Sequence, residues 1–192
     1  MLTKNTWKEV PFSGFLDRSY HTSTLFKHYI ITYGGYSLKT NFWADEPIEI
    51  FNIEKGQLEK FNLKGDELQP VLRHSACLID PNKILIFGGF SLQHIINDVA
   101  IITIEETSRK IKCLFILYPL AELTLTYKKI VTTGGENFRT CAHTADIFRN
   151  KMYVFGGRIK NKPSANTNEL WSLDLENFHW EQCETTGDKP RN

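Results

Sequence analysis

Three histidines stand at the start of similar stretches, which read HTSTLF from His21, HSACLI from His74 and HTADIF from His143. Three imidazole groups can bind a metal ion when their nitrogens lie within about 2.0–2.3 Å of one point. Side chains at equivalent places of separate repeats seldom come that close together. We therefore interpret each histidine as the start of a strand, hydrogen-bonded within its own repeat, and we expect neither a metal ion nor a cofactor.

Residue patterns that would carry catalysis are missing from the sequence. It contains no G-x-S-x-G nucleophile motif, no phosphate-binding loop and no dinucleotide-binding fingerprint. Aspartate and glutamate residues are scattered through loops and strand ends without a recognisable pair. We therefore predict no catalytic residues and no enzymatic activity for this chain.

A pair of glycines follows an apolar run three times, in IITYGGY (30–36), ILIFGGF (84–90) and MYVFGGR (152–158). Each run is apolar at consecutive positions, which is typical of a strand buried on both faces. We interpret both glycines of each pair as structural, because a residue without Cβ tolerates positive φ and leaves room for a bulky neighbour. The positions are Gly34, Gly35, Gly88, Gly89, Gly156 and Gly157.

Two further features recur with the glycine pairs. A tryptophan stands seven residues before a single glycine at Trp7 and Trp180, and the same step joins Leu58 to Gly65 and Tyr127 to Gly134. An arginine follows each single glycine at a short distance, at Arg18, Arg73, Arg139 and Arg191. We interpret these arginines as hydrogen-bond donors to backbone carbonyls of a repeated scaffold, in preference to a ring of ligand-binding cations.

Each repeat therefore comprises four short strands joined by turns of hairpin length, without helical periodicity. The repeats span about 18–65, 73–134 and 139–187, and a strand at 5–11 is left from a preceding unit. We predict one all-β domain over residues 1–192, with three four-stranded sheets and this extra N-terminal strand. Residues 105–124 are additional sequence in the second repeat. They predict an extra strand or an extended hairpin, because Pro119 argues against a continuous helix.

The composition narrows the classes of partner. A net charge of +1 is too small to attract nucleic acid or an anionic membrane through bulk electrostatics. No apolar run approaches the ~18 residues that a membrane span needs. The four cysteines form no C-x-x-C pair, and the sequence has no N-glycosylation sequon. We interpret the cysteines as reduced and the protein as cytoplasmic.

The combined pattern resembles the kelch-repeat family, whose fold is a β-propeller. The resemblance rests on the glycine pairs, on the upstream histidines and arginines, and on Trp7 and Trp180 with Tyr127 in the same place. It implies an incomplete kelch-type propeller of radially arranged sheets, or blades, because three blades cannot close a ring. We expect the chain to be part of a longer propeller, and pairing of two copies into a six-bladed ring is the alternative. Open blade faces would then invite self-association.

The resemblance also implies a non-catalytic scaffold that binds another protein through one face. The loops after each glycine pair and the links between blades lie on that face, and such loops commonly carry recognition. We predict contacts from Phe42, Trp43, Arg158, Lys160 and Lys162. Trp43 packed back on its blade and a merely solvated basic loop stay open as alternatives. The alternative function is an accessory propeller of a larger enzyme whose catalytic residues lie outside this chain.

Overall fold

The computed structural model describes residues 18–37, 39, 42–44, 46–113, 116–159, 166–188 and 190. Within these residues the chain forms nineteen strands and no helix, so the predicted all-β fold is confirmed. No helix in this described part is long and apolar enough to cross a membrane. The predicted strand 5–11, which includes Trp7, lies outside the described residues.

Three sheets make up the body of the molecule, and each contains one of the three strands that precede a glycine pair. The first sheet has the order β1 (Thr22–Phe26), β2 (Tyr29–Tyr33), β5 (Ile48–Asn52) and β6 (Gln57–Leu58). The second has the order β7 (Phe61–Gly65), β13 (Ile116–Ile130), β12 (Val99–Cys113), β9 (Lys83–Phe87) and β8 (Ser75–Asp80). The third has the order β15 (Thr144–Phe148), β16 (Lys151–Phe155), β18 (Leu170–Asp174) and β19 (Trp180–Gln182).

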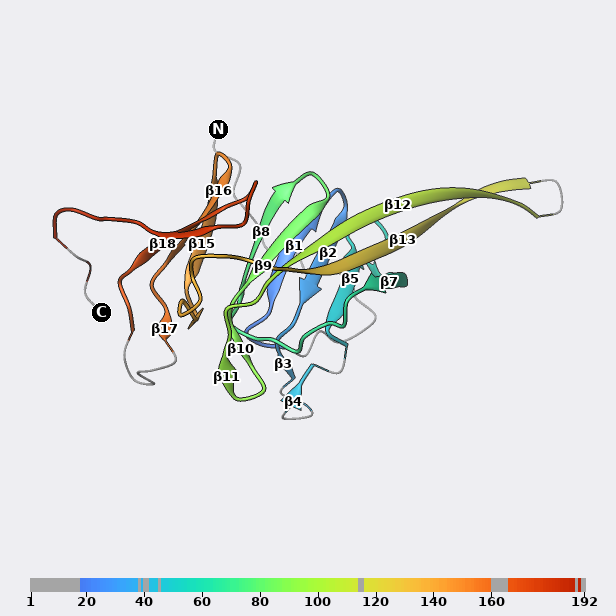
Figure 1. The fold of residues 1–192 in the computed structure, drawn as a ribbon. Coiled ribbons are helices and arrows are strands. Elements are labelled where there is room, and N and C mark those ends of the chain that lie inside the picture. The colour runs from blue at the N-terminus through green and yellow to red at the C-terminus, as the bar shows by residue number, and fades with distance from the viewer. Residues whose placement is uncertain are drawn as a thin grey trace, which may run out of the picture.

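Three short strand pairs lie beyond the glycine pairs, on one side of the molecule. They are β3 (Tyr36–Ser37) with β4 (Phe42–Trp43), β10 (Phe90–Ser91) with β11 (His94–Ile95), and β14 (Thr140–Cys141) with β17 (Arg158–Ile159). Figure 1 shows β3, β4, β10, β11 and β17 together at the bottom of the view, below the three sheets. We call this side the loop face.

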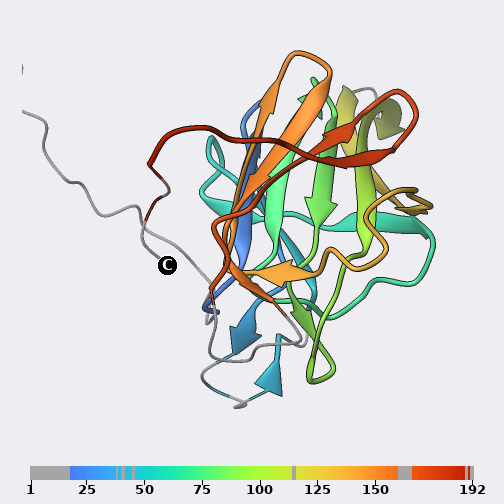
Figure 2. The same ribbon diagram turned by 60° about the vertical axis from the view of Figure 1, so that its left-hand side comes forward.

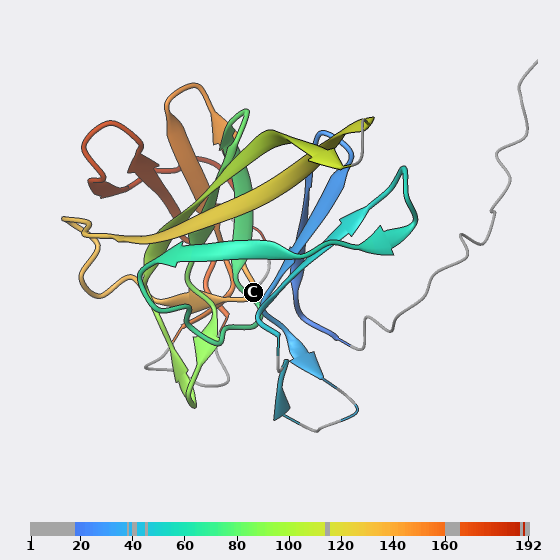
Figure 3. The ribbon, with the colours of Figure 1, turned by 90° about the vertical axis from the view of Figure 1, so that its right-hand side faces the viewer.

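The sheets pack face to face, and a hydrophobic core fills each of the two junctions. Strands of the first and second sheets contribute the first core, which includes Ile31, Tyr33 and Ile102. The second core lies between the second and third sheets and includes Phe87 and Val154. Figure 3 shows the three sheets side by side as a fan, and Figure 2 shows the same order from another direction. The consecutive apolar residues of β9 are explained by burial on both faces, because Ile84 and Ile86 lie in the first core and Leu85 and Phe87 in the second. Strand β2 contributes side chains to the first core alone.

The second sheet has five strands, where the sequence predicts four. The step from Leu58 to Gly65 was expected to form one strand that closes the first blade. Only Gln57 and Leu58 pair with β5, and β7 crosses to pair in parallel with β13 of the second sheet. The physical reason is that β13 is 15 residues long and offers a free edge of backbone hydrogen-bonding groups, which β7 covers.

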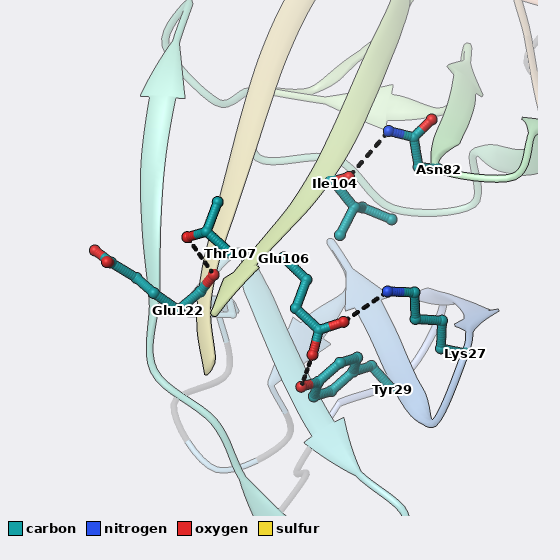
Figure 4. A network of polar contacts seen from close by, with 7 residues as sticks. All are labelled: Lys27, Tyr29, Asn82, Ile104, Glu106, Thr107 and Glu122. Atoms are coloured by element: carbon teal, nitrogen blue, oxygen red, sulfur yellow. Dashed lines mark hydrogen bonds and ion pairs between the residues drawn. The ribbon is translucent and has the colours of Figure 1, made fainter. Parts of the chain in front are cut away.

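Residues 105–124 form the outer part of one long hairpin, in which β12 and β13 pair continuously from Val99–Ile130 to Cys113–Ile116. Figure 1 shows this ribbon projecting from the body, far from the loop face. Near its base, Glu106 on β12 pairs with Lys27 Nζ at 2.6 Å and accepts a hydrogen bond from Tyr29 Oη at 3.0 Å (Figure 4). The ribbon is therefore tied to the first sheet.

Candidate functional site

The glycine pairs turn the chain out of each sheet, and the first two pairs also join their sheet to the next one. In the first pair, Gly34 N–H donates to Pro47 O within the same blade, and Gly35 N–H donates to Val71 O of the next blade, both at 2.8 Å. Both glycines have positive φ, at 67° and 101°. A Cβ on Gly34 would lie 2.2 Å from the Val71 carbonyl oxygen, so only glycine fits this approach. The backbone therefore passes close to the neighbouring blade.

The histidines also connect neighbouring blades, which corrects the prediction of hydrogen bonds within each repeat. His74 Nε2 lies 2.7 Å from Thr22 Oγ1 of the first sheet, and His143 Nε2 lies 2.9 Å from Ser75 Oγ of the second. Burial lowers the pKa of His74 to about 3 and that of His143 to about 4. These two imidazoles are therefore neutral at physiological pH and link neighbouring sheets by hydrogen bonds.

His21 is exposed, and its pKa is lowered first by burial and then by the charge of Arg18. No group of three or more histidine, cysteine, aspartate or glutamate side chains in the described part of the chain is arranged to hold a metal ion. His74 and His143 face different junctions, as their hydrogen bonds show.

The arginines do not share one structural position. Arg18 donates to Gly34 O at 2.9 Å and Glu46 O at 2.8 Å, and it pairs with the Glu49 carboxylate. Arg73 instead lies over the Tyr20 ring, with its guanidinium carbon 4.4 Å from the ring centre. Arg139 is half-buried, and Arg191 lies outside the described residues. An arginine that follows a single glycine at a short distance therefore does not have one fixed role.

Tyr127 and Trp180, which stand seven residues before a single glycine, lie in the hydrophobic cores. Tyr127 and Trp180 are 2% and 3% exposed, and Trp180 packs against Phe87 with ring centres 4.6 Å apart. The carbonyl oxygens of these two residues lie against single glycines of the preceding repeat. A Cβ would stand 2.1 Å from Tyr127 O at Gly65 and 2.3 Å from Trp180 O at Gly134. The single glycines are thus explained by a close approach to a parallel neighbour, since Gly65 pairs with Tyr127 of β13 and Gly134 follows the bridge from Thr133 to His179.

A pocket of about 550 Å³ opens on the loop face, where the inner ends of the three sheets converge. Its lining comes from two kinds of position, the residues just before each histidine and the strands just after each glycine pair. The lining residues are Tyr20, Tyr36, Leu72, Arg73, Phe90, Gln93, His94, Ile95, Cys141 and Arg158. Volumes of this size are common for ligand sites, so this pocket is the candidate functional site.

Backbone hydrogen bonds position the pocket walls. Arg73 N–H donates to Tyr20 O at 2.9 Å, and Ala142 N–H donates to Arg73 O at 2.8 Å. These three residues have φ between 56° and 60°, an uncommon value outside glycine. The strained backbone is held because each residue bonds to its equivalent in a neighbouring blade.

The pocket is both apolar and cationic. Tyr20, Tyr36 and Phe90 supply rings, Arg73 and Arg158 supply charge, and the described residues of its lining include no aspartate or glutamate. The Cys141 thiol is buried, and burial raises its pKa although both guanidinium groups lower it. This cysteine therefore stays protonated and contributes an apolar surface. An anionic group flanked by apolar atoms is the ligand chemistry that such walls favour.

The structure places the predicted contact residues differently. Arg158 lies in the pocket. Trp43 is half-buried and packs against Phe90 of the second blade, with ring centres 6.4 Å apart and planes at 28°. Phe42 pairs through its backbone with Ser37 in β3. Lys160 and Lys162 lie outside the described residues, so their proposed role stays a prediction.

Sequence reasoning missed most of the pocket. Tyr20, Leu72 and Cys141 each stand two or fewer residues from the interpreted histidine of their repeat, and were not considered as ligand contacts. Arg73 was assigned to the scaffold. The available signal was that residues beside a repeated motif vary from repeat to repeat, as Tyr20, Arg73 and Ala142 do.

Comparison with known proteins decides the family. A family model described as the KLHDC2/KLHL20/DRC7 Kelch-repeats domain matches residues 20–192. The chain belongs to the kelch-repeat family. The predicted incomplete kelch-type β-propeller is therefore confirmed, and kelch repeats generally mediate binding between proteins.

Individual relatives of this kelch chain are distant. It is 24% identical over 174 residues to the Leucine-zipper-like transcriptional regulator 1 homolog of Drosophila melanogaster, covering 90% of this chain and 16% of that protein. It is 25% identical over 144 residues to the tRNA wybutosine-synthesizing protein 2/3/4 of Arabidopsis thaliana, covering 73% of this chain and 12% of that protein. The chain thus spans less than a fifth of either relative.

One solved structure shows a similar fold. A chain in the cryo-EM structure of RAG in complex with one melted RSS and one unmelted RSS aligns with a TM-score of 0.60 at 14% identity. The alignment covers 86% of the kelch chain and 51% of that chain. At this identity, the likeness concerns the fold alone.

Proposed function

We propose that this kelch chain is a non-catalytic interaction module that binds an acidic, partly apolar segment of another protein in the pocket on the loop face. The observation that carries the proposal is the pairing of Arg73 and Arg158 with aromatic walls in a pocket that no carboxylate of the described residues lines. A carboxylate entering between the two arginines would therefore meet no competing acidic side chain from the described part of the lining.

The geometry of Arg73 supports this assignment. Its guanidinium lies over the Tyr20 ring, which holds the planar group by a cation–π contact. A guanidinium held by its face still presents its edge, where N–H groups can donate two hydrogen bonds to one carboxylate. Among the described residues, no acidic side chain forms an ion pair with Arg73 or Arg158.

Apolar contacts would supply the rest of the affinity. Phe90 and Ile95 line the pocket from the second blade, and Trp43 extends the ring surface by stacking on Phe90. Aromatic and arginine side chains are the residues that most often dominate protein interfaces. The bound segment should therefore combine at least one carboxylate with a neighbouring apolar or aromatic side chain.

A peptide-binding experiment tests this function. Fluorescence anisotropy would compare a labelled acidic–aromatic peptide panel with the same panel in which each acid is replaced by its amide. Arg73→Ala and Arg158→Ala should each weaken binding of the acidic peptides about tenfold or more, because a charge-assisted hydrogen bond contributes roughly 1.5–3 kcal/mol. The affinity of Arg73→Lys should lie between those of the parent chain and Arg73→Ala, since lysine keeps the charge and loses the planar stacking.

The control is Lys64→Ala, which removes an exposed cation on β7 outside the pocket lining and should leave affinity unchanged. Equal binding of the acidic and amide panels would contradict the proposed ligand chemistry. If neither arginine substitution changed the affinity, the peptides would bind elsewhere on the chain.

A second candidate function is that of an accessory propeller in a larger enzyme. It is favoured by the similarity to the Arabidopsis thaliana relative, which is named a tRNA wybutosine-synthesizing protein and of which the chain spans only 12%. In that case the chemistry would lie outside these residues. Sequencing the complete transcript tests this candidate, since a catalytic domain in the same reading frame would support it and its lack would oppose it.

We also propose a cytoplasmic location. Cys77, Cys141 and Cys183 are free thiols, which is compatible with a reducing compartment. Cell fractionation with an antibody to the chain would test the location, and recovery in the secreted fraction would contradict it.

A further inference from the structure

The third sheet has an outer face that no described residue of another sheet covers. Ala145, Met152 and Val154 pack toward the second sheet, so the alternating neighbours on β15 and β16 point the other way. Two of those neighbours are large and exposed, since Phe148 is 61% and Phe155 is 38% accessible. The question is what this face can bind.

Two backbone contacts recur at both junctions of the body. A second glycine donates its N–H to the next blade, from Gly35 to Val71 O at 2.8 Å and from Gly89 to Thr140 O at 2.9 Å. A residue with positive φ donates its N–H back to the previous blade, from Arg73 to Tyr20 O and from Ala142 to Arg73 O.

Two further contacts recur in the same way. The histidine of each following blade reaches a hydroxyl on the preceding one, from His74 to Thr22 and from His143 to Ser75. A single glycine of the preceding repeat lies against the carbonyl of the following blade's ring position, as Gly65 and Gly134 do. Together these four contacts define the junction between one blade and the next.

The third sheet has the groups with which a preceding blade makes all four contacts. These groups are Gly157 N–H, Ala142 O, Thr144 Oγ1 and the open space beside Gly187. In the described part of the chain, no hydrogen bond reaches the first three groups. A Cβ on Gly187 would meet no atom within 4 Å, although its φ of 91° matches the other single glycines.

The first sheet carries the other half. The Arg18 carbonyl is at the position equivalent to the Val71 and Thr140 carbonyls, which accept from a glycine of the preceding blade. The Tyr20 N–H is equivalent to the Arg73 N–H, and the Leu58 carbonyl is equivalent to the Tyr127 carbonyl. His21 precedes Thr22 as His74 precedes Ser75, and its ring is exposed. No described residue forms a hydrogen bond with Tyr20 N–H.

We propose that the outer face of the third sheet binds the first sheet of a second copy of this chain. The four contacts would then become Gly157 N–H to Arg18 O, Tyr20 N–H to Ala142 O, His21 to Thr144, and Gly187 against Leu58 O. Two such junctions related by a twofold axis close a ring of six blades, within the ~4–8 blades that propellers use.

Side chains on the two faces are compatible with this junction. Cys77 Sγ donates to Ala145 O at 3.3 Å in the existing second junction. The acceptor in that bond is a backbone carbonyl. The equivalent positions in the new junction are Asp146 and Ser23, so the Asp146 carboxylate would replace the thiol donor and only the Ser23 hydroxyl could donate to it. Ser23 Oγ already lies 3.1 Å from Thr32 Oγ1, which can donate to it and leave the Ser23 proton for Asp146. Leu25, 57% exposed on the outer side of β1, would pack against the aromatic side chains of the third sheet.

Sedimentation velocity on the full chain at micromolar concentration tests the proposal. The expected species has twice the chain's mass of 22.2 kDa. Leu25→Glu disables only the first-sheet face, and Phe155→Glu disables only the third-sheet face, so each variant alone should be monomeric. Val131→Glu changes a residue that is 91% exposed and should leave the dimer unchanged.

Mixing the two monomeric variants distinguishes this head-to-tail junction from a symmetric contact. Each partner keeps one intact face, so a 1:1 mixture should recover a heterodimer through a single junction. A monomeric parent chain would overturn the proposal, and so would a mixture that stays monomeric. Phe148→Glu provides a second third-sheet variant, and circular dichroism checks that every variant is folded. Arg73→Ala should leave the dimer mass unchanged, so this proposal can fail independently of pocket binding.

Discussion

At the scale of single residues, the repeated glycines and histidines act between blades. The sequence could predict that the glycine pairs are structural, because a continuous apolar run before them indicates a doubly buried strand. It could not show that Gly35 donates to Val71 or that His74 reaches Thr22, since both contacts join residues more than thirty positions apart. The histidine prediction was wrong for this reason, as spacing within a repeat contains no information about the neighbouring repeat.

Gly89→Ala should lower the free energy of unfolding by about 2–5 kcal/mol. The new Cβ would stand 2.7 Å from Val71 Cγ2 and 2.8 Å from Leu72 O, at a φ of 100° that alanine rarely adopts. Gly187→Ala is the matched control, because its φ is similar and no atom lies near, so only ~1–2 kcal/mol of backbone strain is expected. Urea unfolding measures both, and equal losses would contradict the close packing of Gly89 against the Val71–Leu72 segment of its own blade.

The buried histidines should make stability depend on pH. Folded pKa values of about 3 for His74 and about 4 for His143 lie below the unfolded value of 6.5. Above pH 6.5 both states are neutral and stability is full. As pH falls from 6.5 toward 4, only the unfolded chain takes up these protons, and each histidine costs up to about 1.4 kcal/mol per pH unit.

His143→Gln should therefore flatten the fall in stability between pH 6.5 and 4.5 relative to the parent chain. Denaturant unfolding at several pH values measures the two slopes. His94→Gln, at an exposed position of β11, is the control and should keep the parent slope. Identical slopes for His143→Gln and the parent would show that the imidazole is not held neutral.

At the scale of elements, the sequence predicted where extra chain lies and left its form open between a strand and a hairpin. Residues 105–124 extend the β12–β13 hairpin, and β7 joins it as a parallel neighbour. The sequence treated Leu58 to Gly65 as one strand, because spacing alone does not reveal which edge a strand will pair with. A parallel bridge between Thr133 and His179 shows the same crossing in the next repeat.

Glu106→Gln should loosen the ribbon where it meets the first sheet. The Glu106 pKa is lowered chiefly by the hydrogen bond from Lys27, so the carboxylate is charged near neutral pH and binds both Lys27 and Tyr29. Losing the charge should cost about 1 kcal/mol, because Lys27 is half exposed to solvent. Hydrogen exchange of the amides near Glu106 should quicken.

The control for this change is Lys83→Ala, which breaks an exposed ion pair with Asp80 and should cost less than about 0.5 kcal/mol. If Glu106→Gln cost no more than this control, the ribbon would be held by its backbone pairing alone.

At the scale of the whole molecule, the candidate site exists only where three blades meet. The sequence could predict the loop face, because alternate loops of a meander fall on the same side. It could not predict a pocket built from Tyr20, Arg73 and Arg158, since these residues belong to three repeats and to two different positions of the motif. Lys160 and Lys162 lie outside the described residues and remain predicted contacts.

The central claim is that the glycine-pair strands belong to three blades joined by hydrogen bonds from Gly35 to Val71 and from Gly89 to Thr140. Nuclear magnetic resonance couplings across hydrogen bonds measure this directly, between each glycine amide nitrogen and the carbonyl carbon of its acceptor. The account predicts both couplings, together with amides that exchange slowly with solvent. Glycine amides that exchange at once, or that couple to carbonyls of their own sheet, would contradict it.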